Sequence, residues 1–292
     1  DYTPNYSAKA LVSRRTSTIG LLLTDLTNPL LMQVARSVEQ ELKGLGYVTL
    51  LAASNDDPEE ELRALATFRA RQVDGMLVYP LHHGRIEAVQ RLRSGGMPMV
   101  LLAGGGAGEV DVVCLDEHHG ALLATRYLVE AGHRRIALID GAHQRGNPTK
   151  RDGFSDALRS AGVADVPELI VNPMGGSLRH GYDAFARLMV LPDPPTAILT
   201  ANDRLALGGL RWCQDQGFKV PRDLAIFGYD DVEYAEFASP PLSSVNYPSE
   251  ELARRSVARL MVLIDSRGAL PQPELVRIHP KLVLRESTKL SL

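Results

Sequence analysis

Short runs of aliphatic and β-branched residues alternate with longer amphipathic segments along nearly the whole chain. The first run, residues 18–24, is followed by a segment at 28–45 that opens with Asn28-Pro29, an N-cap residue and a first-turn proline. Strands that alternate with helices in this way pack as parallel sheets covered by helices. The sequence therefore predicts an α/β fold.

The same alternation runs through both halves of the chain. In the first half we predict strands at 18–24, 47–53, 75–79, 98–102 and 112–115, and helices at 28–45, from 57 onwards and at 85–94. In the second half we predict strands at 135–139, 169–171, 197–200 and 224–228, and helices at 120–131, 149–161, 177–190 and 204–216. A helix to about 265 and strands at 274–278 and 281–285 follow. The halves share this pattern and not residue identity, so we expect two similar lobes, each a parallel sheet flanked by helices.

No linker rich in Gly, Pro or Ser divides the two lobes, so we expect short crossovers to join them. We assign residues 18–116 and 247–275 to the N-terminal lobe, 117–246 and 276–292 to the C-terminal lobe, and set 1–17 apart. Ligands of parallel α/β sheets bind outside the carboxyl ends of the strands. The predicted ligand site is therefore a cleft where the carboxyl ends of the two sheets face each other.

Composition and motifs exclude several classes of protein. With a net charge of -3, the body of the chain is not expected to bind nucleic acid over its whole surface. No apolar run predicts a membrane span and no leader pattern predicts secretion, so we expect a cytoplasmic protein. Cys114 and Cys213 lie in apolar surroundings and are expected to be reduced core thiols. The pairs His82-His83 and His118-His119 lack a third ligand at metal-site spacing, and Gly104–Gly108 lacks the residues of a phosphate loop. We predict no metal, no cofactor and no catalytic residues.

The first fifteen residues differ from the rest of the chain in charge. They contain three basic residues, Lys9, Arg14 and Arg15, and one acidic residue, Asp1. The chain begins without Met, which we interpret as a truncation. A short helix starting near Asn5 would carry apolar residues on adjoining turns, but it is shorter than the ~12 residues that a free helix needs. From periodicity alone, a frayed terminus is the better interpretation.

The order of motifs along the chain resembles that of a known family. Tyr2-x-Pro4-Asn5-x-x-Ala8-x-x-Leu11, followed by Thr16-x-x-Ile19-Gly20-Leu21, resembles the hinge helix and first strand of LacI/GalR transcription regulators. Further segments are similar to the family's motifs in the expected order: 25–29, 73–78, 132–137, 195–198, 202–203, 217–223, 228–231 and 285–287. The chain as a whole thus resembles the effector-binding and dimerising body of such a regulator, with a periplasmic-binding-protein-like fold and without most of the DNA-binding head.

The resemblance implies that residues 1–17 are the remnant of the DNA-binding region and contact DNA. Leu11 would be inserted between base steps in the minor groove by paired hinge helices, and Lys9, Arg14 and Arg15 would contact phosphates of operator DNA. The alternative for these basic residues is a solvated tail. Without its head, the chain should bind operator weakly or not at all.

The resemblance also implies ligand contacts at strand ends. We predict that Asn202, Asp230 and Arg151 bind the effector, a sugar, sugar derivative or purine-like molecule. Additional predicted contacts are Asp25, Asn28, Leu31 and Asp116. An ion pair between Arg151 and Asp230 is the alternative for those two residues, while Asn28 and Asp203 could be helix caps. Leu30-Leu31 and Gly176 stand where relatives often have aromatic residues, which puts stacking on a ligand ring in doubt.

The predicted function is a ligand-responsive transcription regulator, a repressor, whose effector changes the angle between the lobes. A homodimer or a tetramer is expected, joined through helix faces at 62–68 and 86–92 that could also be core stripes. The alternatives are a solute-binding protein of a sugar transporter and an enzyme acting on a nucleotide or sugar.

Overall fold

The computed structural model describes residues 15–104, 108–141, 147–266 and 269–289, and they form two compact units. Unit 1 takes the chain up to Leu115 together with Pro248–Ile278, and unit 2 takes Asp116–Tyr247 together with the chain from His279 onwards. The lobe boundaries expected from the sequence lie one residue away at the first two crossovers and three residues away at the last.

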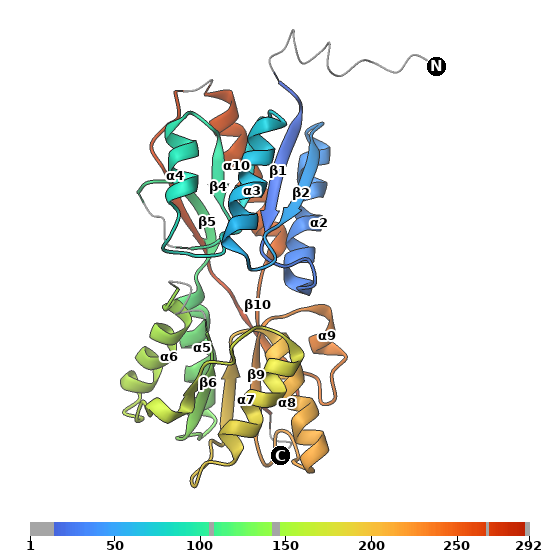
Figure 1. Ribbon diagram of the computed structural model, residues 1–292. Coiled ribbons are helices and arrows are strands. Elements are labelled where there is room, and N and C mark those ends of the chain that lie inside the picture. The colour runs from blue at the N-terminus through green and yellow to red at the C-terminus, as the bar shows by residue number, and fades with distance from the viewer. Residues whose placement is uncertain (1–14, 105–107, 142–146, 267–268, 290–292) are drawn as a thin grey trace. The chain divides into compact units, whose positions relative to one another are not determined.

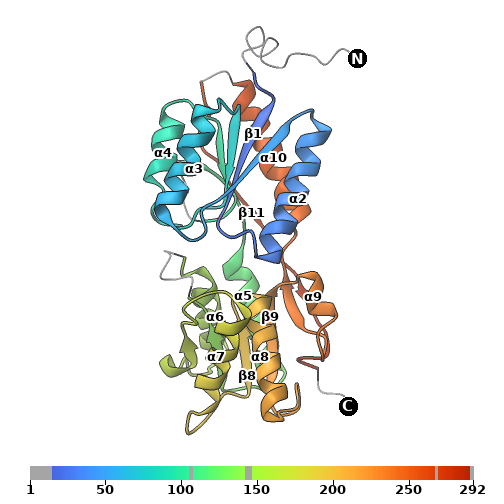
Figure 2. The same ribbon diagram turned by 45° about the vertical axis from the view of Figure 1, so that its right-hand side comes forward.

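Unit 1 is a six-stranded parallel sheet between two pairs of helices. Its strands are β1 (Thr18–Leu23), β2 (Val48–Ala53), β3 (Gly75–Val78), β4 (Met99–Leu101), β5 (Asp111–Leu115) and β11 (Leu275–Ile278). Its helices are α2 (Pro29–Gly44), α3 (Pro58–Ala70), α4 (Glu87–Ser94) and α10 (Ser249–Asp265). Helices α2 and α10 cover one face of the sheet, and α3 and α4 cover the other (Figure 1; Figure 2).

Unit 2 has the same plan. Its strands are β6 (Ile136–Ile139), β7 (Ile170–Val171), β8 (Ala197–Thr200), β9 (Ala225–Asp230), β10 (Ser243–Asn246) and β12 (Leu282–Val283). Its helices are α5 (Glu117–Glu130), α6 (Thr149–Ser160), α7 (Leu178–Met189), α8 (Asp203–Gln216) and α9 (Glu233–Glu236), with a 3₁₀ turn at Pro167–Leu169. Helices α5 and α6 lie on one side of this sheet and α7 and α8 on the other (Figure 1).

The strand orders reveal an internal structural repeat. The sheet of unit 1 runs β2-β1-β3-β4-β5-β11, and that of unit 2 runs β7-β6-β8-β9-β10-β12. All neighbours are parallel except β10 and β12. The prediction of two similar parallel α/β lobes is confirmed.

Central strands are apolar because helices cover both of their sides. In β1, the side chains of Ile19, Leu21, Leu22 and Leu23 are all fully buried, which explains an uninterrupted apolar run in place of an alternating one. Where that strand ends, the Asn28 side chain accepts a hydrogen bond from the amide of Leu30 and starts α2. The first strand and helix are thus encoded locally.

Several elements of unit 2 differ from the prediction, and strands β10 and β9 and helix α5 are three of them. Strand β10 was not predicted, because its sequence is short and polar. Its residues Ser243 and Ser244 are nevertheless buried, and their hydroxyl groups form hydrogen bonds with other side chains. Helix α5 begins at Glu117 and not at 120, because Asp116 accepts a hydrogen bond from the amide of His119 and caps it. Strand β9 continues to Asp230, two residues beyond the predicted end at Gly228.

Glycines allow helices α7 and α8 to approach closely. A Cβ atom at Gly181 would collide with the backbone of Leu205, and one at Gly208 would collide with the carbonyl oxygen of Leu178. Each helix thus presents a glycine to the backbone of the other, which fixes the packing of this helix pair against the sheet of unit 2.

Both cysteines are buried free thiols, and burial raises the pKa of Cys213 to about 12. Within the ranges that the structure describes, no helix is both long and apolar enough to cross a membrane, and no three His, Cys, Asp or Glu side chains are grouped as a metal ion requires.

Candidate functional site

Asp230 is the most unusual residue at the carboxyl end of the unit 2 sheet. It is the last residue of β9, is only 6% exposed, and has a φ of 109°, a backbone conformation that residues other than glycine rarely adopt. No hydrogen bond or ion pair joins its carboxylate to another residue in the described part of the chain. A buried carboxylate without a partner is costly, so a ligand is a natural explanation for it.

Lys150, in the first turn of α6, is the cation that acts most strongly on this carboxylate among the described residues. Its ammonium group lies 3.0 Å from Oε1 of Glu117 and 4.3 Å from the centre of the Tyr229 ring, and it donates a 3.1 Å hydrogen bond to the carbonyl of Ala201. The side chain is only 12% exposed. Lys150 therefore ties α6 to α5 and to the ends of β8 and β9.

Glu117 is the centre of a polar network at the start of α5. Its carboxylate accepts hydrogen bonds from Asn147 Nδ2 at 2.5 Å and from Thr149 Oγ1 at 3.1 Å, in addition to the ion pair with Lys150. Its carbonyl accepts a 3.3 Å hydrogen bond from the Tyr229 hydroxyl. A side chain at Gly120 would occupy the place of that hydroxyl, so the glycine lets Tyr229 reach α5.

Burial and charge shift the titration of this cluster. Burial raises the pKa of Asp230 well above its usual range, and Lys150 opposes the rise only in part. Burial by itself lowers the pKa of Lys150, but the neighbouring charges, Glu117 first among them, outweigh it, so the pKa is raised. The neighbouring charges thus favour the protonated, charged form of Lys150, whereas burial favours the protonated, neutral form of Asp230.

Asn202 and Asp203 have separate roles, and the alternative that Asp203 is the helix cap is wrong. The side chain of Asn202, and not that of Asp203, caps α8 by accepting a 2.9 Å hydrogen bond from the amide of Leu205. Asp203 is buried and accepts hydrogen bonds from the Val232 amide and the Ser244 hydroxyl, and burial raises its pKa to about 7. The amide nitrogen of Asn202 is therefore the part of that side chain left for a ligand.

Arg151 does not form the ion pair with Asp230 that was its alternative role. Among the described residues no ion pair includes Arg151, and the cation near Asp230 is the preceding residue, Lys150. Helix periodicity contained this signal, because Lys150 lies three and four residues before the buried Gly153 and Phe154 and so shares their face. Neither Lys150 nor its partners Glu117 and Tyr229 were among the residues predicted for the site.

The predicted ligand residues of unit 1 lie around the carboxyl end of β1. Asp25 is half-buried and accepts hydrogen bonds from the amide and hydroxyl of Thr27, both at 2.7 Å, while Asn28 caps α2. Leu31 is 2% exposed, so little of it is left to touch a ligand. Asp116, in unit 2, caps α5 and has one carboxylate oxygen 3.5 Å from Nδ1 of His279. Their ligand contacts stay predictions.

Of the four predicted DNA contacts, only Arg15 falls in the described residues; Lys9, Leu11 and Arg14 lie outside them. The guanidinium of Arg15 forms a 2.7 Å ion pair with Asp265 at the end of α10. Thr16 and Ser17 next to it donate backbone hydrogen bonds to the carboxylate of Asp74. The chain is therefore anchored to unit 1 just before β1.

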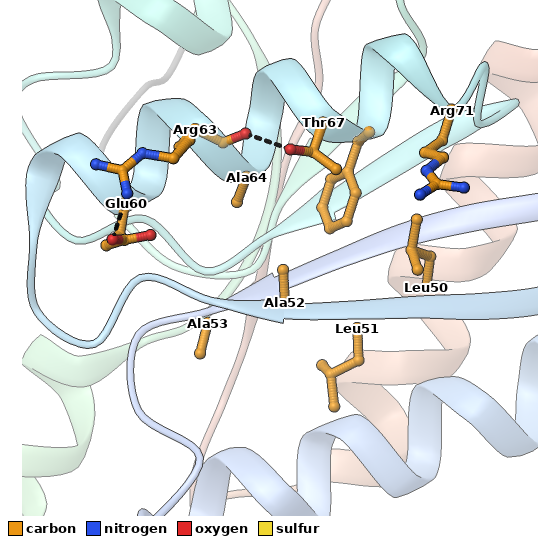
Figure 3. A pocket seen from close by; sticks show the side chains of 10 residues that line it. Leu50, Leu51, Ala52, Ala53, Glu60, Arg63, Ala64, Thr67 and Arg71 are labelled. Carbon is orange, nitrogen blue, oxygen red and sulfur yellow. Dashed lines mark hydrogen bonds and ion pairs between the residues drawn. The ribbon is translucent and has the colours of Figure 1, made fainter.

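A hollow of about 490 Å³ lies beside β2, the edge strand of the unit 1 sheet (Figure 3). Ala52 points toward α3, whereas Leu51 points to the opposite face of the sheet. The hollow is lined by Leu50, Leu51, Ala52, Ala53, Glu60, Arg63, Ala64, Thr67, Phe68 and Arg71. Val48 and Leu51 are 66% and 40% exposed, and Leu62 on α3 is 50% exposed. This edge is an apolar surface without the buried polar groups of a small-molecule site.

Comparison with known proteins identifies the family. The model of the periplasmic binding protein-like domain matches residues 125–288. The ribose operon repressor of Haemophilus influenzae is 32% identical over 289 residues, which cover 98% of this chain and 86% of the repressor. This chain belongs to the LacI family of transcriptional regulators.

Solved structures agree with this assignment. The structure of a LacI-family transcriptional regulator from Sanguibacter keddieii is similar to this chain, with a TM-score of 0.83 and 30% sequence identity. The match covers 94% of this chain and 98% of the Sanguibacter chain. A complex of the transcriptional regulator CelR with cellobiose matches with a TM-score of 0.83 and 29% identity, over 98% and 92%. The chain is thus the ligand-binding regulatory part of a transcriptional regulator and not an enzyme, and the transport-protein alternative is not favoured.

Proposed function

We propose that the LacI-family chain binds its effector at the carboxyl end of the unit 2 sheet, with Asp230 as the central contact. The observation that carries this proposal is the Asp230 carboxylate, which is buried, without a partner among the described residues, and held at a strained φ. The amide of Asn202 and the guanidinium of Arg151 are the further contacts proposed in unit 2. In unit 1, Asp25, Asn28 and Leu31 remain predicted contacts, as does Asp116 at the first crossover.

The proposed effector is a small polar molecule such as a sugar or sugar derivative. A carboxylate accepts hydrogen bonds from hydroxyl and amine donors, and the related regulator CelR is solved with cellobiose. A purine-like effector is the second candidate, favoured less because no aromatic residue stands at Leu31 or Gly176 to stack on a flat ring.

Operator DNA is the proposed macromolecular partner, and it implies a cytoplasmic location. Lys9, Leu11, Arg14 and Arg15 are the proposed DNA contacts next to the DNA-binding head. Because Arg15 already pairs with Asp265, a contact between Arg15 and phosphate requires that this exposed ion pair opens, which costs little.

A homodimer is the proposed assembly, joined through the edge strand β2 and helix α3 of unit 1. Exposed apolar side chains on a free sheet edge are a surface that proteins normally cover. Leu51→Lys should therefore lower the association of the chain in sedimentation velocity, and the same measurement separates a dimer from a tetramer. Unchanged association in this variant would contradict the proposed surface.

The effector site is tested by thermal-shift screening of sugars, polyols, sugar acids and purines. A ligand at 100 times its dissociation constant stabilises the chain by ~2.7 kcal/mol. Asp230→Asn should abolish that shift and Arg151→Ala should reduce it. Asp183→Asn is the matched control, because Asp183 is a half-exposed acid in the middle of α7. An Asp230→Asn chain that keeps the full shift would show that the site is wrong.

A further inference from the structure

The turn at the end of β9 has an unusual backbone conformation. Asp230 has a φ of 109° and Asp231 a φ of 52°, and both values lie in the region that favours glycine. A residue in such a conformation costs free energy and persists only where the surrounding structure holds it in place. Contacts within unit 2 must therefore hold this turn.

Side chains, and not backbone groups, accept the hydrogen bonds of the two amides that follow Asp230. The amide of Asp231 donates a 3.1 Å hydrogen bond to the hydroxyl oxygen of Ser244, in β10. The amide of Val232 donates a 2.9 Å hydrogen bond to Oδ2 of Asp203, the first residue of α8. The direction of the chain after Asp230 is thus set by two side chains from other elements.

The carboxylate of Asp203 joins these two contacts. Its other oxygen, Oδ1, accepts a 2.7 Å hydrogen bond from the hydroxyl of Ser244, so the amide of Asp231 is tied to the same carboxylate through the serine. Asp203 and Ser244 are fully buried, so bulk water does not compete for these bonds. A Cβ atom at Gly228 would collide with Oδ1 of Asp203, so the glycine leaves room for the carboxylate beside β9.

Other groups hold the turn at different atoms. The carbonyl oxygen of Asp230 accepts a 3.0 Å hydrogen bond from the amide of Tyr247. Arg285 pairs with the side chain of Asp231 at 2.7 Å and does not bind its amide. Asp203 is therefore the group through which both amides after Asp230 are fixed.

We propose that Asp203 is the positioning residue of the effector site: its carboxylate holds the amides of Asp231 and Val232, and thereby keeps Asp230 in the backbone conformation from which it contacts the effector. This inference rests on the effector site proposed above. Because Asp203 is fully buried, it acts through Asp230 and does not touch the effector itself.

The first test needs no ligand. Hydrogen exchange of single backbone amides is measured by nuclear magnetic resonance, and the rates at Asp231 and Val232 are expressed relative to the amides of β8. Asp203→Ala should speed this relative exchange about tenfold at Val232, which loses its acceptor, and by less at Asp231. Ser244→Ala should give the opposite order, because it removes the acceptor of the Asp231 amide and leaves Asp203 in place.

Two further variants separate positioning from general stability. Leu188→Ala is the control: Leu188 is fully buried in α7, so its loss should destabilise unit 2 without changing the relative exchange of the turn. Asp203→Asn keeps an acceptor oxygen for the Val232 amide, so its exchange there should lie closer to the wild type than to Asp203→Ala. If Asp203→Ala does not fold by circular dichroism, Asp203→Asn and Ser244→Ala decide the question.

The second test measures the strain at position 230. Glycine adopts a φ of 109° without strain and alanine does not, so the urea midpoints of Asp230→Gly and Asp230→Ala differ by the strain plus the intrinsic difference between the two residues. The same pair is made in the Asp203→Ala background, where the intrinsic difference is unchanged. The gap in favour of glycine should shrink there, because the turn is free to relax.

The outcomes distinguish this inference from the effector site. If Asp203→Ala speeds the turn and β8 alike, or if the gap between glycine and alanine is equal in the two backgrounds, Asp203 does not position Asp230 and the inference is overturned. The effector site then still stands, because Asp230→Asn tests it in the thermal-shift screen. An Asp230→Asn chain that keeps the full shift would overturn the site and the inference together.

Discussion

Asp111 joins helices on both faces of the unit 1 sheet through a buried ionic network. This first residue of β5 is fully buried, and its carboxylate accepts hydrogen bonds from Arg93 of α4 at 3.0 Å and from Arg259 of α10 at 2.6 Å. It also accepts one from the backbone amide of Glu274 at 3.1 Å, just before β11. The arginine side chains are only 12% and 11% exposed.

Replacing Asp111 by Ala should cost about 3–5 kcal/mol of the free energy of unfolding, because two buried guanidinium groups would face each other without their shared anion. Asp265→Ala is the matched control: it also removes an Asp partner of an arginine, but that carboxylate is 70% exposed, so the loss should be about 0–1 kcal/mol.

Both values are measured by urea unfolding, followed by far-ultraviolet circular dichroism for the whole chain and by fluorescence of the single tryptophan, Trp212, for unit 2. The loss in Asp111→Ala should be seen in the circular dichroism transition. Equal small losses in the two variants would refute the reasoning that burial, and not ion-pair count, sets the contribution of this network.

Other consequences can be checked in the same way. The pKa of Asp203 is raised to about 7 from its usual 3.8, so its charged form is disfavoured in the folded state and the free energy of unfolding should fall as pH rises from about 4 through 7. The difference between the free energies of unfolding at about pH 5 and about pH 8 should be smaller in Asp203→Asn than in the wild-type chain. Gly208→Ala should destabilise by about 1–3 kcal/mol through its collision with Leu178, while Gly44→Ala, which meets no atom, should not destabilise the chain. Cys213, whose pKa is raised to about 12, should resist alkylation at about pH 8 until urea unfolds unit 2.

Most of the fold was predictable because its signals are local. Uninterrupted apolar runs such as Thr18–Leu23 and caps such as Asn28 act within a few residues, so strands and helices could be placed to within a few positions. Strand β10 escaped prediction because its serines are buried only through partners distant in sequence, among them Asp203 and Thr288. No window of sequence contains that information.

The candidate site was predictable in part for the same reason. Asp230 could be chosen from its position after an apolar run, but its strained φ and missing partner depend on the packed structure. Arg151 was predicted because it matches the family's arginine on this helix, whereas the residue that lies on the buried face of α6 is Lys150. The pairing of Lys150 with Glu117 brings together residues more than thirty positions apart, which periodicity cannot show.

The chain passes between the units three times, and this affects when unit 1 can fold during synthesis. All of unit 2 up to Tyr247 is inserted between β5 and α10, so the sheet of unit 1 acquires its edge strand β11 only after that whole insertion has been synthesised. Until then, Asp111 also lacks two of its hydrogen-bond donors, the side chain of Arg259 and the backbone amide of Glu274. A ribosome-bound chain that ends before Asp265 should therefore remain open to proteolysis in its first hundred residues, even though those residues already encode most of the strands of unit 1.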